Sequence, residues 1–103
     1  MLIPTIKEKR RYIHFRLDCA CRLSEKEAKE ELHKAILYFL GELGFSKANP
    51  KLIDFKDNSG ILMCSNSEVQ KVKAALALVS KIKEEKGCIR VVKVSGMLSK
   101  LKS

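Results

Sequence analysis

The sequence predicts an α+β domain in which two helices cover one face of a four-stranded antiparallel sheet. Three observations lead to this prediction. Residues 12–18 alternate apolar and polar side chains, as a strand with one buried face does. Two segments repeat apolar residues at a spacing of three and four, each behind a Ser-x-x-Glu pattern typical of a helix N-terminus. Between these segments, a turn-forming stretch separates two short apolar runs, which indicates a β-hairpin.

The first strand and the first helix have the strongest patterns. The strand carries Ile13, Phe15 and Leu17 on one side and Tyr12, His14 and Arg16 on the other. Ser24 and Glu27 can form a capping box, and acidic residues in the first turns suit the helix dipole. The apolar stripe that follows contains Ala28, Leu32, Ala35, Ile36, Phe39, Leu40 and Leu43. Gly44 is expected to end this helix.

A hairpin is expected next, between strands at residues 51–55 and 61–65. In the turn that joins these strands, Asp57, Asn58 and Gly60 are residue types that suit turn dihedrals.

The second helix is expected to begin at a second capping box, formed by Ser65 and Glu68. Its buried positions would be Val69, Val72, Leu76, Val79 and Ile82. Gly87 would end it, before a last strand at residues 88–95. The resulting order βαββαβ predicts a ferredoxin-like sandwich, which is also the architecture of RNA-recognition modules. No linker divides the chain, so residues 1–103 are expected to form a single domain.

The charge of the chain favours a polyanionic partner. Against 12 acidic residues stand 21 basic ones, which give a net charge of +9 and a pI near 9.6. Residues 1–16 contain five cations against one acid, and residues 86–103 contain five cations and no acid. The domain is therefore expected to have a basic N-terminal arm, residues 1–11, and a basic C-terminal tail, residues 96–103. No apolar run approaches the roughly 20 residues that span a bilayer, and residues 1–4 are too short for a signal peptide. A cytoplasmic location is therefore expected, with no membrane partner.

Arg10 and Arg11 suit phosphate groups, because a guanidinium can donate two parallel hydrogen bonds. Lysines 7, 9, 100 and 102 would act as mobile point charges. The alternative is a solvated run of charge that only keeps the protein in solution. The first and last strands are antiparallel, and from this the arm and the tail are expected to leave from opposite ends of the strand pair. One continuous basic patch would then require an arm to fold back.

Residues for catalysis or metal binding are not evident in the sequence. His14 and His33 have no carboxylate partner implied by spacing, and the loop at residues 19–25 lacks the glycines of a phosphate cradle. Four cysteines include only one close pair, Cys19 and Cys21, without a second pair at zinc spacing. We therefore expect reduced thiols, no bound metal and no catalytic residue. An acylphosphatase-like enzyme remains an alternative, supported only by Arg22.

Two further features bear on binding. RNA-recognition modules stack bases on aromatic residues of their central strands, but only Tyr12 could offer an aromatic ring there, so phosphate contacts are expected to dominate.

The first helix also carries Leu37 and Tyr38 outside its apolar stripe. These side chains are candidates for a protein-partner surface, and a protein–protein module with incidental charge is the main alternative function.

Four segments resemble, in order and spacing, the archaeal ribonuclease P protein component 2 family, which is related to a eukaryotic ribonuclease P and MRP subunit. They are "LIPTIKEKRRYIHF", "NPKLIDFKDNSGILMCS", "VKAALALVSKI" and "VVKVSGMLSKLK". The most specific parts are the K-x-R-Y entry to the first strand, ending at Tyr12, and the V-S-G motif of residues 94–96. The pair Cys19 and Cys21 departs from the family pattern.

The resemblance implies a non-catalytic subunit of the ribonucleoprotein that removes 5′ leaders from precursor tRNA. The RNA would be the catalyst and Mg²⁺ its metal, with no cofactor bound by the protein. The implied partners are ribonuclease P RNA, precursor tRNA through the holoenzyme, ribonuclease P protein component 3, and a second copy in a homodimer within a heterotetramer. The residues that would meet RNA are Lys7, Lys9, Arg10, Arg11, Tyr12, Ser95, Lys100 and Lys102.

Overall fold

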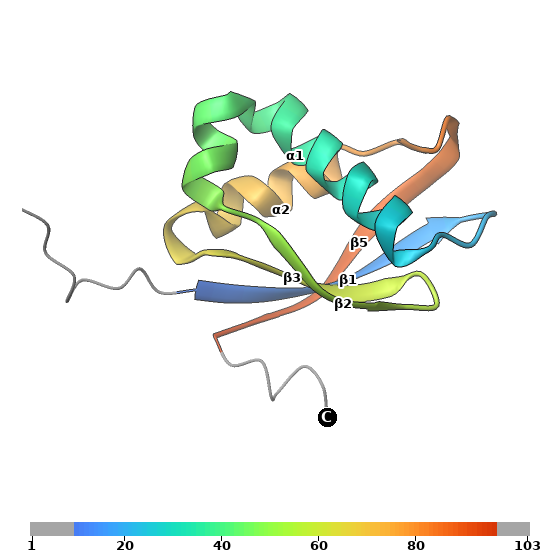
Figure 1. Cartoon of the computed structure of the whole chain (residues 1–103), viewed down its shortest axis with the longest axis horizontal. Coiled ribbons are helices and arrows are strands. Elements are labelled where there is room, and N and C mark those ends of the chain that lie inside the picture. Colours follow the sequence, from blue (N-terminus) through green and yellow to red (C-terminus); the bar gives the residue numbers. More distant parts are fainter. Residues whose placement is uncertain (1–9, 97–103) are drawn as a thin grey trace, which may run out of the picture.

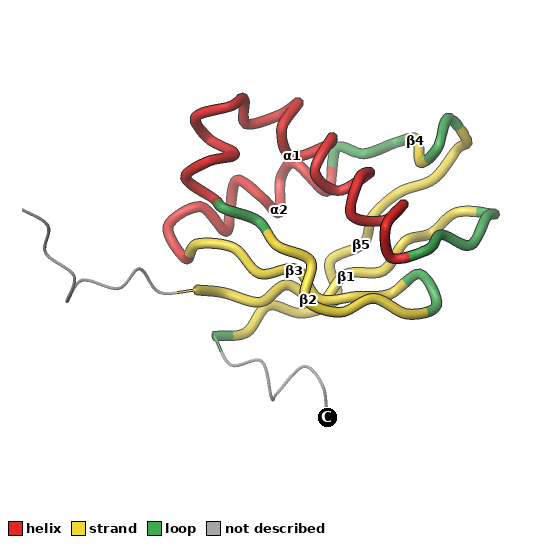
Figure 2. The backbone as a smooth tube through the Cα atoms, viewed as in Figure 1, coloured by secondary structure: helices red, strands yellow, loops and turns green. Residues whose placement is uncertain are grey.

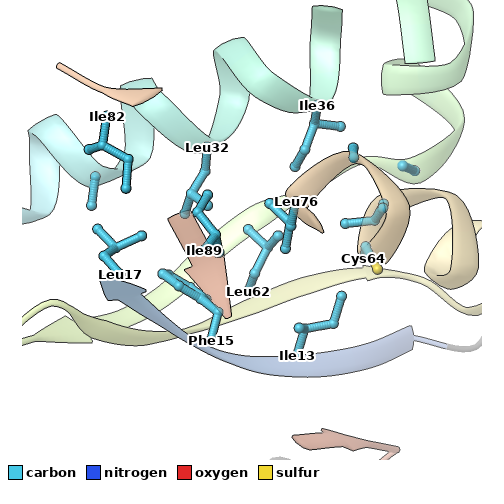
Figure 3. Close-up of a cluster of buried hydrophobic side chains, with 14 of the residues drawn as sticks. Ile13, Phe15, Leu17, Leu32, Ile36, Leu62, Cys64, Leu76, Ile82 and Ile89 are labelled. Carbon is cyan, nitrogen blue, oxygen red and sulfur yellow. The ribbon is translucent and has the colours of Figure 1, made fainter. Parts of the chain in front are cut away.

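Strand β1 (Arg10–Cys19) runs through the middle of the sheet, and its alternating pattern is confirmed. Ile13, Phe15 and Leu17 are buried, whereas Arg16 on the opposite side is exposed. Figure 3 shows the buried row beneath Leu32 of the first helix. At about 1.5–3 kcal/mol for each large apolar side chain removed from water, this row is a main source of core stability.

The computed structural model describes residues 10–96. The strands form one antiparallel sheet in the order β2-β3-β1-β5-β4, and both helices lie on the same face (Figures 1 and 2). The remaining elements are α1 (Glu25–Ala48), β2 (Lys51–Lys56), β3 (Ser59–Ser65), α2 (Val69–Ala77), β4 (Lys81–Ile82) and β5 (Glu85–Ser95). The face without helices is called the open face below. The predicted α+β class is correct.

Helix α1 begins at the predicted capping box but does not end where expected. The backbone N–H of Glu27 donates to Ser24 Oγ at 3.2 Å, and the N–H of Ser24 donates to Glu27 Oε1 at 3.0 Å. The helix continues past Gly44 to Ala48, where Asn49 caps it in a left-handed conformation (φ 45°, ψ 57°). The predicted terminator is wrong, because Gly44 does not take the left-handed conformation and Asn49 does. The glycine with a positive φ is Gly41 (φ 77°, ψ 175°), where the chain bends within the helix.

The bend at Gly41 separates two helical segments, residues 25–40 and 42–48, which point in different directions (Figure 1). Ala28, Leu32 and Ile36 of the predicted stripe are buried. Leu40 also packs against the core, whereas Phe39 is 47% and Leu43 72% exposed. The stripe is thus only partly buried, and Leu43 lies beyond the bend.

The β2–β3 hairpin turns at Asp57 and Asn58, which have positive φ angles of 53° and 58°. Gly60 lies in β3 and not in the turn, contrary to the prediction. A Cβ on Gly60 would lie 2.4 Å from the carbonyl oxygen of Asp54 and 3.1 Å from the ring of Phe15. Glycine is therefore needed here for close packing of the strands over the Phe15 ring.

The second capping box is absent. Ser65 Oγ donates to the carbonyl oxygen of Lys47 at 2.9 Å, and a 3₁₀ turn, Asn66–Glu68, precedes α2. Ser65 thus joins the end of β3 to the end of α1, and no side-chain cap is formed at the start of α2.

Helix α2 ends at Ala77, well before Gly87, and the chain then forms the short strand β4. This extra strand makes the sheet five-stranded and corrects the prediction of four. Ile82 is fully buried as predicted, but from β4. The β4–β5 turn has positive φ at Lys83 and Glu84. Two carboxylates of α1 hold it, since Glu31 Oε1 accepts from the Lys83 N–H at 3.2 Å and Glu27 pairs with the Lys83 ammonium.

Neither helix in the described part of the chain is long and apolar enough to cross a membrane.

Candidate nucleic-acid interface

The start of β1 and the end of β5 lie side by side at one end of the sheet (Figure 1). Tyr12 pairs with Ser95, and Ile13 pairs with Val94. The expectation that the two basic ends leave from opposite ends of the strand pair is wrong. In an antiparallel pair the beginning of one strand necessarily faces the end of the other. Arg10 and Gly96, the ends of the described chain, therefore belong to one region.

A polar hollow opens in this region. It is lined by Arg10, Tyr12, Ser46, Lys47, Asn49, Ser65 and Gly96, and has a volume of about 920 Å³. We call it the terminal hollow. Its lining combines β1, the last turn of α1, the end of β3 and the residue after β5. No acidic side chain is among these lining residues, so its cations are not neutralised locally. Such a site favours anions.

Arg10 and Arg11 point to opposite faces of the sheet and have different surroundings. Arg10 is exposed, lines the terminal hollow and places Nη1 3.8 Å from the sulfur of Met63. Arg11 Nε donates to Asn66 Oδ1 at 2.6 Å. A Cβ on Gly96 would lie 2.9 Å from Arg11 Nη1, so glycine makes room for this guanidinium. Arg11 therefore joins β1 to the 3₁₀ turn before α2, and of the two arginines only Arg10 lines the hollow.

The open face carries further cations that the sequence analysis did not select. Lys93 pairs with His14 of β1, and Lys51 pairs with Met63. Lys51, Lys93 and Arg16 are exposed. They lie on the same face as Tyr12, because paired residues share a face of the sheet. The alternation of side chains along β1 and β5 already indicated cations on the open face, but the prediction was based on the clusters of charge near the two ends of the chain. Arg90, on the same face, is paired with Asp18 at 2.8 Å.

The predicted RNA-contacting residues are only partly described. Lys7, Lys9, Lys100 and Lys102 lie outside residues 10–96. Tyr12 is partly buried and lines the terminal hollow, and Ser95 is its cross-strand neighbour.

The histidines show no catalytic arrangement within residues 10–96. His14 Nε2 lies 3.0 Å from Ser59 Oγ on the open face. His33 packs edge-on against Phe45, with ring centroids 5.2 Å apart, and burial, aided by the charge of Lys29, lowers the pKa of the imidazole.

The cysteines in the described chain are all free thiols. Burial raises the pKa of Cys64 to about 11, which makes this thiol a poor nucleophile. Burial and the neighbouring Cys19 also raise the pKa of Cys21. Across residues 10–96, no cluster of three or more His, Cys, Asp or Glu side chains could hold a metal ion.

A second hollow lies on the helix side. It is lined by Glu31, Lys34, Ala35, Tyr38, Phe39, Ala75, Leu78, Val79, Ser80, Lys81, Ile82, Glu84 and Ile89, and has a volume of about 520 Å³. We call it the helix groove. Tyr38, a predicted partner residue, is 91% exposed at this groove. Leu37 is 43% exposed but is not part of the lining. Exposed Phe39 and Leu78 complete the apolar surface. Phe39 was expected on the buried stripe of α1, and neither residue was predicted to contact a partner.

The fold and this surface define a small α+β sandwich with cations on its open face and an apolar groove on its helix layer. A family model described as the Rpp14/Pop5 family matches residues 11–103. The chain belongs to that family, which confirms the resemblance seen in the sequence. The family consists of protein components of ribonuclease P, and the process to which the family belongs is tRNA processing.

Curated relatives agree with this assignment. The chain is 41% identical to ribonuclease P protein component 2 of Pyrococcus furiosus, over 98% of this chain and 86% of that protein. It is also 41% identical to the component 2 protein of Methanocaldococcus jannaschii, over 98% of this chain and 75% of that protein. A chain in the cryo-EM structure of yeast ribonuclease MRP has a similar fold, with a TM-score of 0.73 and 9% identity, covering 91% of this chain and 79% of that one.

Proposed function

We propose that this chain is an RNA-binding, non-catalytic subunit of ribonuclease P. In this role it supports the RNA that removes 5′ leaders from precursor tRNA in the cytoplasm. The catalytic groups and the Mg²⁺ ions belong to the RNA, and the protein contributes cations that bind and position the RNA backbone. Family membership supports the assignment to ribonuclease P.

The observation that carries the RNA-binding part of the proposal is the surface that joins the terminal hollow to the open face. Arg10 and Lys47 face a hollow without acidic lining residues. Arg16, Lys51 and Lys93 extend the positive charge over the open face. Arginine forks and lysine ammonium groups are the usual ligands of RNA phosphates, and such contacts fix register without reading sequence.

Protein partners are proposed for the opposite side of the molecule. The helix groove, with Tyr38 and Leu78 exposed beside it, would receive ribonuclease P protein component 3. A second copy of the chain, as a homodimer within a heterotetramer, is a further proposed contact. The exposed apolar groove also favours the second candidate function, a protein–protein module whose charge is incidental.

The direct test is leader removal from a precursor tRNA at limiting Mg²⁺. The reaction contains the cognate RNA and component 3, with or without this chain. Cleavage that requires the chain supports the proposal. Unchanged cleavage, with binding to component 3 intact, would leave the protein–protein module as the better description.

A pair of variants sharpens this test. Arg10→Ala removes a cation from the terminal hollow, whereas Arg22→Ala removes one from an exposed ion pair with Asp57, 3.2 Å long, in the loop after β1. Arg10→Ala should weaken RNA binding and reduce the slope of log K against log salt by about 0.9 for duplex-like RNA, by analogy with DNA. Arg22→Ala should change neither. Equal losses for both variants would indicate a general charge effect.

A further inference from the structure

The terminal hollow is lined by an aromatic residue as well as by cations. Its cations come from different elements, Arg10 from β1 and Lys47 from the last turn of α1, and both side chains are exposed. Tyr12, an aromatic residue, lines the same hollow. An aromatic ring contributes little to binding a phosphate, so its presence beside two cations suggests a ligand with both an anionic and a planar part.

The ring of Tyr12 is not used for aromatic packing within residues 10–96. The ring contacts in this part of the chain join Phe15 to Phe55 and His33 to Phe45. Tyr12 instead stands on the open face, paired with Ser95 on one side and Met63 on the other. A partly buried ring in this position can accept a planar group on its outer surface.

Polar side chains from the end of α1 complete the hollow. Ser46 and Asn49 are exposed and line it. The backbone N–H of Asn49 donates to the carbonyl of Phe45 at 2.9 Å, so the helix cap is made by the backbone and does not require the side-chain amide. Hydroxyl and amide groups of this kind pair with ribose hydroxyls and base edges.

The shape and charge of the hollow restrict the ligand further. A volume of about 920 Å³ falls within the range of small-molecule sites, roughly 300–1,000 Å³, and exceeds the needs of a bare phosphate. The acidic residues Glu31 and Glu84 line the helix groove but not this one. A base within a duplex has its faces covered by its neighbours, so only an unpaired nucleotide could place its base against Tyr12.

We propose that the terminal hollow binds one unpaired nucleotide of an RNA. The phosphate lies between Arg10 and Lys47, the base stacks on the ring of Tyr12, and the side chains of Ser46 and Asn49 meet the ribose or the base edge. This inference rests on the proposed function and deepens it, because it names the RNA element that the site takes. It also changes the expectation from the sequence that binding uses phosphate contacts without base stacking.

The test measures binding of the full chain to fluorescent hexaadenylate RNA, to the same sequence as DNA, and to a short RNA duplex. Tyr12→Leu should lower affinity for hexaadenylate RNA about tenfold, which is typical of one lost stacked base, and should leave duplex binding unchanged. Tyr12→Phe keeps the ring and should bind hexaadenylate like the unaltered chain. The DNA should bind more weakly than the RNA, because it lacks the 2′-hydroxyl.

Lys47→Ala provides an independent arm that leaves β1 untouched. It should weaken binding of hexaadenylate RNA and reduce its salt slope by about 0.7, the value for one phosphate of a single strand. Lys26→Ala is the matched control, since Lys26 is an exposed lysine near the other end of α1 and does not line the hollow. Thermal melting of each variant identifies any loss that comes from unfolding.

The outcomes separate this inference from the proposed function. If Tyr12→Leu and Lys47→Ala leave hexaadenylate binding unchanged while the chain still supports leader removal, the nucleotide site is wrong and the function stands. Equal weakening of duplex and hexaadenylate binding by Tyr12→Leu also overturns the nucleotide site. If the chain neither binds RNA nor supports leader removal, the proposed function itself fails.

Discussion

The terminal hollow and the helix groove differ in chemistry although α1 contributes to both. The hollow contains Arg10 and Lys47 without an acidic lining residue, whereas the groove has an apolar floor at Ile82 and balances Lys34 with Glu31, 3.4 Å apart. Charge left unbalanced favours an anionic ligand, and exposed apolar area favours a protein. Within residues 10–96, the unbalanced cations of the terminal hollow are therefore separate from the apolar surface of the helix groove.

The bend at Gly41 divides the contributions of α1 between the two regions. Tyr38 and Phe39, before the bend, line the helix groove, and Ser46 and Lys47, after it, line the terminal hollow. A straight helix would direct its last turn elsewhere. The backbone conformation of one glycine thus allows a single helix to serve two different surfaces.

The largest expected effect concerns the floor of the helix groove. Ile82→Ala removes a fully buried side chain and should lower the free energy of unfolding by about 2–5 kcal/mol, because a cavity remains in the core. Chemical denaturation measures it. Ile53→Ala, the same change at a 36% exposed position in β2, should cost about 1 kcal/mol or less. Similar losses for both variants would mean that β4 does not pack on the core as described.

Gly41→Ala tests the bend that separates the two regions. A Cβ there would contact nothing within 4 Å, so the cost comes from the backbone alone (φ 77°, ψ 175°). That region of φ/ψ space is nearly exclusive to glycine, and the free energy of unfolding should fall by about 1–3 kcal/mol. Glu42→Ala, at the next exposed position, should be close to neutral. A neutral Gly41→Ala variant would show that α1 is straight in solution.

One variant in each region tests whether the two regions bind different partners. Tyr38→Ala should weaken binding to component 3 by about 1–2 kcal/mol, which is typical of an exposed aromatic at an interface, and should leave RNA affinity unchanged. Arg10→Ala should do the reverse, through the loss of a phosphate contact. Anisotropy titrations with each partner measure both affinities. If either variant weakened both kinds of binding, the two surfaces would not be independent.

The smallest effect is a pH dependence in the turn that forms one wall of the helix groove. The ion pair with Lys83, and then the N–H of Ser24, lower the pKa of Glu27 below its usual value of 4.5. A lowered folded pKa stabilises the protein fully above pH 4.5, and this contribution is lost as the pH falls through the folded pKa. Denaturation midpoints measured down to about pH 3 should show this loss, and Lys83→Met should reduce it. An unchanged acid dependence in Lys83→Met would remove the ion pair as its cause.

Much of the fold could be predicted because its signals are local. The alternation around Phe15 requires only that one face of a strand be buried, and the capping box at Ser24 involves residues three positions apart. The burial of Ile82 was also predicted, but its element was not. A position three residues after Val79 fits a helix equally well, and the sequence does not indicate that a turn at Lys83 would be held by carboxylates of a different helix.

The candidate site was only partly accessible from the sequence. Arg10 and Tyr12 stood out as members of a basic cluster ahead of a strand, and both line the terminal hollow. Lys47 did not, since it lies 37 positions from Arg10 and is unremarkable within its helix. The sequence also offered no reason to separate Arg10 from Arg11, although Arg11 contacts Asn66 on the helix side and does not line the hollow. The RNA contact predicted for Arg11 stays a prediction.

The sequence by itself determined the class of fold, the net charge of +9, the buried row of β1 and the start of α1, since these depend on composition and on neighbours a few residues apart. Only the tertiary structure decided the bend at Gly41, the extra strand β4 and the meeting of Arg10 with Lys47 at one hollow. Each of these requires contacts between elements distant in the chain, and such contacts select among local conformations that the sequence leaves nearly equal in energy.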